Sequence, residues 1–308
     1  MIPDIVRSVM VERSIADDVG VASRRLCFSC GSHASRRLFH KFGYAIVQCD
    51  ACEIVYCDHS PSQKELSEYY SEGYFKGCTD QRGYYDYEAD EPLLKASFLP
   101  KLRLVNRLAP RIGTLLDIGC AAGYFLELAS DQGWAAYGLE VSAFAANMAR
   151  RRGLRVVNGT SPAVFQAGQF DAITMWDVVE HLPDPVVFLK ETNRLLRAGG
   201  LLSLCTGRID STLAKLCGRH SRIFNPPQHL TFFSRRSIER VLNLAGFRVI
   251  KVLMDKKLVS LRYLLHLQIS LFGEHSTRGI ARRLVKTSFN PAIPVLIPDN
   301  MVVTARKL

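Results

Sequence analysis

The sequence predicts an α/β fold built around a parallel β-sheet, and three observations support this fold class. An apolar run over residues 114–118 leads directly into a loop that contains two glycines. A second run, 134–139, ends in Glu140, and a third, 170–176, ends in Asp177. Short apolar runs that stop at polar or glycine-rich turns are typical of strands buried in a parallel sheet. The 308 residues, 48% of them hydrophobic, suffice for a sizeable core and for two domains.

The loop after the first run has the composition of a nucleotide-binding turn. Gly119 permits a tight turn and close backbone approach to a ligand, and Gly123 permits the next helix to pack near the strand. A dinucleotide-binding loop would have glycines where Asp117 and Ala122 stand. The Asp117 carboxylate would repel a diphosphate, but it suits a ligand with an ammonium and a sulfonium group, namely S-adenosylmethionine. Glu140 lies where such a fold presents an acid to a ribose diol.

This region resembles the class I S-adenosylmethionine-dependent methyltransferases in four motifs that occur in order between residues 112 and 206: 117–123, Glu140, 170–182 and 197–202. One departure is Ala121, where the family often has glycine. The resemblance implies a methyltransferase domain over 111–308, with a doubly wound, Rossmann-like sheet of seven strands whose last strand is antiparallel. It also implies a set of cofactor-binding residues, which are Asp117, Gly119, Cys120, Gly123, Tyr124, Glu140, Val141, Trp176 and Asp177.

Two C-x-x-C pairs precede this domain and have the spacing of a zinc ribbon. Eighteen residues separate the pairs, which is enough for a connecting hairpin around Gly43, and the four thiolates are Cys27, Cys30, Cys49 and Cys52. With all four positions filled by protein, the predicted Zn²⁺ is structural. A disulfide or redox role is the alternative. We therefore expect an N-terminal extension over 1–24 and a zinc ribbon over 25–60.

Residues 61–110 form a connector between the ribbon and the predicted methyltransferase domain. Residues 92–109 have the apolar spacing of a helix. The connector is rich in tyrosine, whose rings either stack on a sugar or base or pack in the core: Tyr69, Tyr70, Tyr74, Tyr84, Tyr85 and Tyr87.

Ribbon, connector and class I domain together are similar, over roughly residues 27–250, to zinc-ribbon methyltransferases that include deoxysugar C-methyltransferases. In that family a Glu-His pair after the fifth strand helps to deprotonate the substrate. Here Gln228 precedes His229, so either the base is tuned differently or the reaction is not carbon methylation. The resemblance implies His229 as the catalytic base, since a histidine titrates near neutral pH. His181 is the other catalytic candidate, although Glu180 and His181 could instead shape the pocket wall or cap a helix near Asp184.

The positive charge is concentrated in the last third of the chain. The net charge is +11, and residues 207–308 carry 18 Lys and Arg against 5 Asp and Glu. Such a field indicates an anionic partner, although a solvated basic face is the alternative. Strands are expected at 247–254 and 301–306, with a basic helical insert at about 256–298 that could form a lid, a dimer face or a contact with anionic lipid.

The predicted function is methyl transfer from S-adenosylmethionine to a sugar or other small polar, phosphate-bearing acceptor, such as a nucleotide sugar or a lipid-linked glycan. An RNA methyltransferase that uses the ribbon and the basic third is the first alternative, although no nucleic-acid-binding motif occurs. A non-catalytic, cofactor-binding scaffold is the second. No apolar run of eighteen residues occurs, so we expect a cytoplasmic protein, either free or peripheral at the inner membrane face. The oligomeric state is left open.

Overall fold

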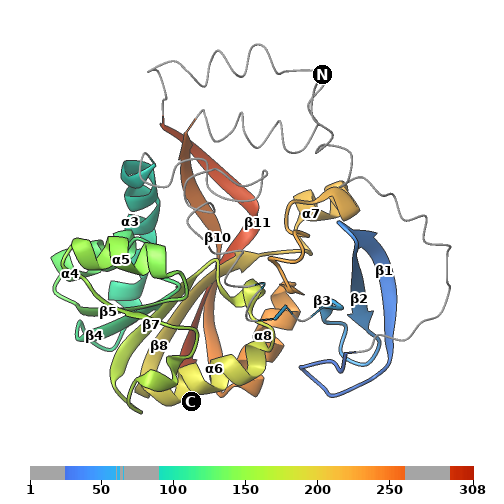
Figure 1. Cartoon of the computed structure of the whole chain (residues 1–308), viewed down its shortest axis with the longest axis horizontal. Helices are drawn as coiled ribbons and strands as arrows, with labels where there is room; N and C mark the ends of the chain where they lie inside the picture. Colours follow the sequence, from blue (N-terminus) through green and yellow to red (C-terminus); the bar gives the residue numbers. More distant parts are fainter. Residues whose placement is uncertain (1–24, 60, 63–64, 66–89, 261–291) are drawn as a thin grey trace, which may run out of the picture.

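Two β-sheets form the framework of the chain (Figure 1). The computed structural model describes residues 25–59, 61–62, 65, 90–260 and 292–308. The larger sheet has seven strands in the order β10-β11-β8-β7-β4-β5-β6. These strands are β4 (Thr114–Ile118), β5 (Ala135–Glu140), β6 (Arg155–Asn158), β7 (Phe170–Trp176), β8 (Leu196–Gly207), β10 (Phe247–Ser260) and β11 (Ala292–Lys307).

Strand direction confirms the predicted fold class. The neighbouring strands from β8 to β6 are all parallel. β11, the last strand in the chain, runs antiparallel to both β8 and β10. Every residue of β7, in the middle of the sheet, is buried, as expected for an apolar strand covered on both faces. The chain therefore has the Rossmann-like, doubly wound sheet that the sequence predicts.

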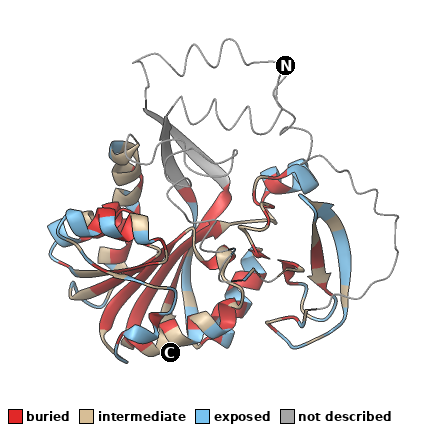
Figure 2. Ribbon diagram, in the orientation of Figure 1, coloured by how far each residue is buried: buried red, intermediate tan, exposed pale blue. Residues whose placement is uncertain are grey.

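Helices cover both faces of this sheet, which gives three layers (Figures 1 and 2). One face carries helices whose apolar residues join a single core cluster, and the other carries two helices that join a second cluster. The first group is α3 (Glu91–Leu108), α4 (Tyr124–Asp131) and α5 (Ala143–Arg151), and the second is α6 (Pro185–Leu195) and α8 (Arg235–Leu244). α3 is the helix predicted at 92–109, which is confirmed.

Helix α6 begins with a local capping signal. The Asp184 side chain accepts a hydrogen bond from the Val187 backbone N–H at 3.0 Å, and Pro185 occupies the first turn. Glu180 and His181 lie in the preceding short helix, η2 (Val179–His181). The idea that these two residues cap a helix is therefore wrong, because Asp184 does so.

The smaller sheet is antiparallel and has the order β1-β2-β3-β9. It consists of β1 (Ser35–Lys41), β2 (Tyr44–Cys49), β3 (Val55–Cys57) and β9 (Thr231–Phe232). The β1–β2 hairpin turns at Phe42 and Gly43, as the sequence predicts. β9, by contrast, comes from the C-terminal half, between helix α7 (Thr212–Cys217) and α8. The ribbon segment therefore shares its sheet with the predicted methyltransferase domain.

The strands at the C-terminal end are longer than expected. β10 and β11 take up both ends of the segment predicted as a helical insert, 256–298, because they pair from Phe247↔Lys307 to Ser260↔Ala292. The rest of that segment lies outside the described residues, as do residues 1–24 and the six connector tyrosines. Among the described helices, none is both long and apolar enough to cross a membrane.

Candidate functional site

The predicted cofactor loop lies at the topological switch point of the sheet. The chain runs outward from β4 to β5 and β6 and then returns to β7 on the other side of β4. Sheets of this kind bind ligands beyond the carboxyl ends of the strands at such a switch point. Gly119 has φ +73°, and a Cβ there would lie 2.5 Å from Val178 Cγ2. Gly123 has φ +84° and precedes α4, and a Cβ there would overlap Leu154 Cδ1. Both positions therefore require glycine.

Glu140 fixes the shape of this loop. Its two carboxylate oxygens accept hydrogen bonds from the backbone N–H groups of Ala121 and Ser142, each at 2.8 Å. Ala121 has φ +48°, a left-handed conformation that a non-glycine residue adopts only with support. Burial raises the pKa of Glu140, while the backbone donors oppose that shift. The sequence assigned Glu140 to a ribose diol, but the structure gives it a second role in holding the loop.

Asp117 is buried at the carboxyl end of β4, with 1% of its surface exposed. Its Oδ1 accepts a hydrogen bond from Thr174 Oγ1 of the adjacent strand β7 at 2.6 Å. Burial raises the pKa of Asp117 to about 8, the Thr174 hydrogen bond lowers it, and the charge of Glu140 raises it further. The carboxylate thus sits in a site that favours an added positive charge.

Trp176 and Tyr124 are both packed into the structure. The Trp176 ring contacts Phe125 at a centroid distance of 5.1 Å and Phe98 at 6.4 Å. Its Nε1 is buried and has no hydrogen-bond partner among the described residues. Tyr124 is 1% exposed, and the Arg152 guanidinium lies over its ring. Of these two side chains, only Trp176 presents an unused hydrogen-bond donor.

Three other predicted cofactor residues, Cys120, Val141 and Asp177, make contacts within the protein. Cys120 is buried, and its Sγ lies where a Cβ on Gly138 would be 2.6 Å away, so the thiol points into the sheet. The Val141 carbonyl accepts a hydrogen bond from Asn158 Nδ2 at 3.0 Å. Asp177 follows β7 with φ +56°, and its N–H donates to the carbonyl of β8 at Cys205. The side chain of Asp177 lies close enough to both candidate histidines to raise their pKa.

The two histidines proposed as bases are brought together by the fold. The rings of His181 and His229 pack edge to face, with centroids 4.9 Å apart. His181 Nδ1 lies 3.0 Å from the Gln228 carbonyl, and His229 Nδ1 lies 2.7 Å from the Ile223 carbonyl. A carbonyl accepts only from a protonated nitrogen, so Nε2 of His229 carries the lone pair.

Both imidazoles are neutral at physiological pH. Burial lowers the pKa of His181 to about 3, with the neighbouring His229 adding to the effect. Burial also lowers the pKa of His229 to about 4. Ligand atoms of Glu180, His181 and His229 all lie within 4.8 Å of one another. This cluster can therefore exchange a proton or provide nitrogen and oxygen ligands.

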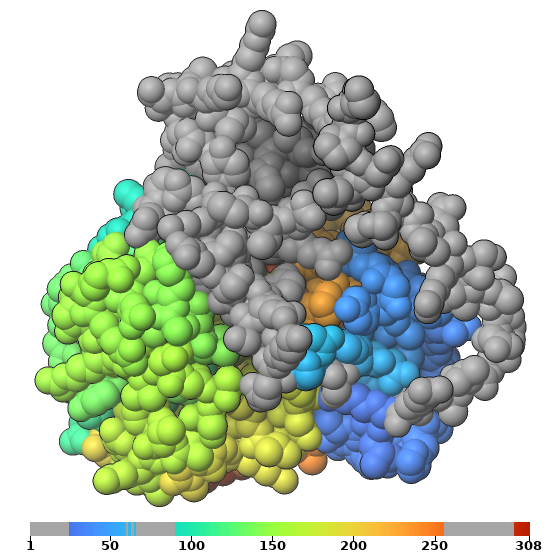
Figure 3. Space-filling model, viewed as in Figure 1, coloured from blue at the N-terminus to red at the C-terminus, as the bar shows by residue number. Residues whose placement is uncertain are grey.

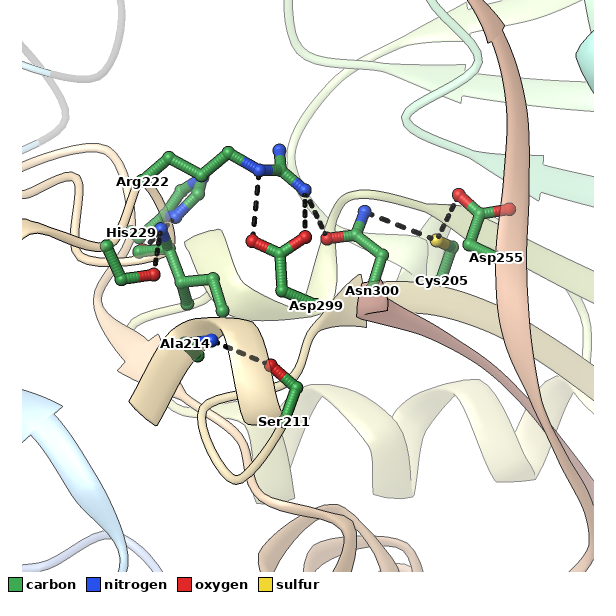
Figure 4. Close-up of polar contacts among 10 residues, drawn as sticks. Cys205, Ser211, Ala214, Arg222, His229, Asp255, Asp299 and Asn300 are labelled. Carbon is green, nitrogen blue, oxygen red and sulfur yellow. Dashed lines mark hydrogen bonds and ion pairs between the residues drawn. The ribbon is translucent and has the colours of Figure 1, made fainter. Parts of the chain in front are cut away.

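Sequence reasoning missed a polar network at the carboxyl end of β8 (Figure 4). Arg222 donates to both oxygens of Asp299 and, at 2.9 Å, to Asn300 Oδ1. The Asn300 amide lies 4.0 Å from Cys205 Sγ, which lies 3.4 Å from Asp255 Oδ2. These residues are far apart in the sequence, so no local pattern marks them as a set.

The network ends in a buried ion pair beside Trp176. Lys101 Nζ of α3 lies 2.9 Å from Asp255 Oδ1, and their side chains are 6% and 1% exposed. The Lys101 ammonium also lies 5.7 Å from the centroid of the Trp176 ring. Two opposite charges without water are stable only together. The buried surroundings of Trp176 therefore include a pair of opposite charges whose net charge is zero.

The four predicted metal ligands converge. Cys27 Sγ lies 3.5 Å from Cys52 Sγ, and Cys30 Sγ lies 3.5 Å from Cys49 Sγ. All four sulfurs lie within 4.8 Å of one another. A tetrahedral ion with sulfur ligands at ~2.3 Å requires sulfurs spaced at roughly 3.8 Å. The donor set therefore fits Zn²⁺.

The ribbon sheet is joined to the histidine loop. The Cys57 N–H of β3 donates to the Leu230 carbonyl at 2.8 Å, and the Leu230 N–H donates to the Glu180 carbonyl at 2.8 Å. Arg25 donates to the Pro183 carbonyl. Arg240 of α8 donates to Ser29 in the first cysteine turn. In the space-filling view the ribbon, in blue, lies directly against the domain (Figure 3).

Comparison with known proteins agrees with this geometry. The methyltransferase domain family matches residues 61–252. Ubiquinone biosynthesis O-methyltransferase from Xanthomonas axonopodis pv. citri (strain 306) is 31% identical over 131 residues, which are 39% of this chain and 55% of that protein. The enzyme of the same name from Pseudomonas paraeruginosa (strain DSM 24068 / PA7) is 30% identical over 114 residues, 33% and 49% of the two chains. The chain thus spans about half the length of these curated relatives.

A solved structure shares the fold over most of the chain. It is the Burkholderia thailandensis 1,6-didemethyltoxoflavin-N1-methyltransferase with bound 1,6-didemethyltoxoflavin and S-adenosylhomocysteine. It has a TM-score of 0.50 and 16% identity, and it covers 88% of this chain and 99% of its own. The family match spans more than half of the chain. The protein therefore belongs to the methyltransferase domain family and carries a class I, S-adenosylmethionine-dependent methyltransferase domain.

Proposed function

We propose that this protein transfers a methyl group from S-adenosylmethionine to a small polar acceptor. The observation that carries the proposal is the convergence of the glycine loop, Asp117 and Glu140 at the switch point of the sheet. The relatives named above are an O-methyltransferase of ubiquinone biosynthesis and an N-methyltransferase of a toxoflavin precursor. Both names support a small-molecule acceptor. A sugar or other small polar acceptor that carries phosphate is the finer form of the proposal, supported by the basic last third of the chain.

Three residues at the switch point would bind different parts of the ligands. Asp117 attracts the cationic end of the cofactor, because its buried carboxyl gains a compensating charge. Glu140 keeps a second lone pair on each oxygen for the ribose hydroxyls while it holds the loop. Trp176 Nε1 offers a donor to a ligand next to the end of β7.

The chemistry consists of orientation and the removal of one proton. The cofactor supplies an electrophilic methyl group on a sulfonium, and the protein places the acceptor atom in line with it. When the acceptor is a hydroxyl, its oxygen would bond to the methyl carbon as the methyl–sulfur bond breaks, which leaves a neutral thioether, and the His229 Nε2 lone pair would take the hydroxyl proton. His181 packs against the His229 ring and fixes its orientation.

Binding of the cofactor is the direct test, and two glycines offer a matched pair of variants. Gly119→Ala places a methyl against Val178, whereas Gly168→Ala has the same left-handed backbone, φ +64°, with no atom within 4 Å. Isothermal titration with S-adenosylmethionine should show binding for wild type and Gly168→Ala and a loss of about tenfold or more for Gly119→Ala. No binding by the wild type, or tighter binding of NADH than of S-adenosylmethionine, would contradict the proposal.

We also propose that Cys27, Cys30, Cys49 and Cys52 hold a structural Zn²⁺. The spacing of their sulfurs supports this, and four protein thiolates leave no ligand position open for a substrate. Elemental analysis of the purified chain should give about one zinc per chain, and Cys49→Ser should lose it. Cys217→Ser is the matched control, because Cys217 is an exposed free thiol outside the cluster. Retention of the metal by Cys49→Ser would refute the assignment.

A further inference from the structure

An exposed surface of mixed apolar and basic character lies where the β1–β2 hairpin meets α7. We define this hairpin–α7 surface as residues 35–44 together with 211–222. Four large apolar side chains on it are exposed to solvent: Leu38 (41%), Phe42 (55%), Leu213 (40%) and Leu216 (81%). Exposed apolar residues scattered singly need no explanation, but a group of them on one surface marks an interaction site.

The two segments form one continuous surface. Lys41 Nζ at the end of β1 donates to the Ser221 carbonyl at 2.9 Å. Beneath it, Phe39 packs edge to face on Phe224 at a centroid distance of 5.0 Å. Ala214 of α7 belongs to the same core cluster as Ile46 of β2. Figure 1 shows α7 beside the arrowhead of β1, and Figure 2 shows exposed residues on both.

The charge of this surface is all of one sign. Residues 35–44 and 211–222 contain six Lys and Arg, two His and no Asp or Glu. Arg36 is paired with Asp50, and Arg222 with Asp299. Lys215 and Arg219 make no ion pair with any residue that the structure describes. The surface therefore carries a positive field beside its exposed leucines.

The residue type at position 42 favours an interaction role for this surface over a purely structural one. It has φ +52° in a two-residue hairpin turn followed by Gly43 at φ +82°. Such turns favour Asn, Asp or Gly at the first position, because a bulky side chain is strained there. Folding alone would therefore favour a smaller residue. The ring is 55% exposed, and the Lys41 ammonium lies 5.5 Å from its centroid, so an apolar and a basic group occur together at this turn.

We propose that the hairpin–α7 surface docks on an anionic lipid bilayer. A bilayer satisfies both features at once, because the acyl boundary accepts the leucines and Phe42 while the headgroup phosphates attract Lys215 and Arg219. A nucleic acid would satisfy the charges but leaves the exposed leucines in water. The surface leads directly into the loop that holds His229, so docking places the catalytic region near the membrane. The docking does not depend on methyl transfer.

Vesicle co-sedimentation of the full chain tests the proposal. The probes are phosphatidylcholine vesicles and vesicles with a quarter phosphatidylglycerol, at low and high salt. Phe42→Asn suits the turn, and Leu216→Gln alters a side chain that is 81% exposed, so both variants should fold. Val187→Gln on α6, 63% exposed, is the matched control. We expect salt-sensitive binding to the anionic vesicles only.

The variants then locate the docking face. Phe42→Asn and Leu216→Gln together should weaken vesicle binding about tenfold or more, and neutralising Lys215 and Arg219 should weaken it by roughly fivefold per charge. Val187→Gln should have no effect. Absence of binding to anionic vesicles overturns the proposal, and so does binding that survives the double variant. RNA retention lost in the same variants would make this surface a nucleic-acid interface and would equally overturn it.

Discussion

Replacing Asp117 by asparagine should remove a defined part of the pH dependence of stability. The native pKa of Asp117 is about 8, mainly because of burial, against an ordinary value of 3.8. Between these values the unfolded chain has released a proton that the native side chain keeps. The contribution of Asp117 to stability is therefore complete below pH 3.8 and is lost as the pH rises to about 8. The loss is about 1.4 kcal/mol per pH unit.

The magnitude can be measured by urea unfolding of wild type and Asp117→Asn at several pH values. From pH 6 to pH 9 the Asp117 component amounts to roughly 2.7 kcal/mol. The wild type should lose about this amount relative to the variant, because the variant lacks the Asp117 carboxyl. Parallel pH profiles for the two proteins would show that Asp117 is already ionised in the native state, and the electrostatic reasoning would fail.

Cofactor binding provides the second part of this test. A cationic ligand stabilises the Asp117 carboxylate, so S-adenosylmethionine should release up to one proton on binding at pH 7. Its affinity should then rise by up to about tenfold per pH unit between pH 6 and 8. Titration calorimetry in buffers of different ionisation enthalpy measures the proton release directly. Asp117→Asn should bind more weakly, with no proton release.

Three further changes test other parts of the site. Lys101→Met removes the ammonium that compensates the buried Asp255 charge, so chemical denaturation should show a loss of about 3–5 kcal/mol, and a matched Asp255→Leu in the same chain should restore much of it. Glu140→Ala removes the acceptor from two backbone N–H groups, so the melting temperature should fall, corresponding to about 1–3 kcal/mol per unsatisfied group, and S-adenosylmethionine should no longer raise it. His229, with its pKa lowered to about 4 by burial, stays a neutral base well below pH 6.5, so with saturating S-adenosylmethionine the acid limb of the kcat profile should lie near pH 4; a limb near 6.5 would contradict this assignment.

The strongest sequence predictions rest on local signals. The run from Thr114 through Gly123 specifies a strand, a tight turn and a helix, because only glycine tolerates the backbone at its two positions. The cysteine spacing specifies a knuckle, because each C-x-x-C turn delivers two sulfurs to one point. These features come from neighbouring residues, and the structure shows them with the predicted bounds or close to them.

The features that the sequence did not predict depend on contacts between distant residues. β9 joins the ribbon through only two residues, too short a segment to carry a strand pattern. The Arg222, Asp299 and Cys205 network joins residues up to 95 positions apart. β10 is longer than its apolar run, because pairing with β11 supports the polar residues that follow Met254. Each is decided by contacts that exist only after the chain has folded.

The sequence by itself determined the α/β class, the position of the glycine loop and the set of four cysteines that converge, because backbone sterics and short spacings act within a few residues. Only the tertiary structure decided that Glu140 holds the loop, that Asp117 is buried beside Thr174, and that His181 meets His229. Those outcomes depend on which strands become neighbours and on how much water they exclude. Burial and pairing set the charge state of each group, so the chemistry of the site depends on the whole fold.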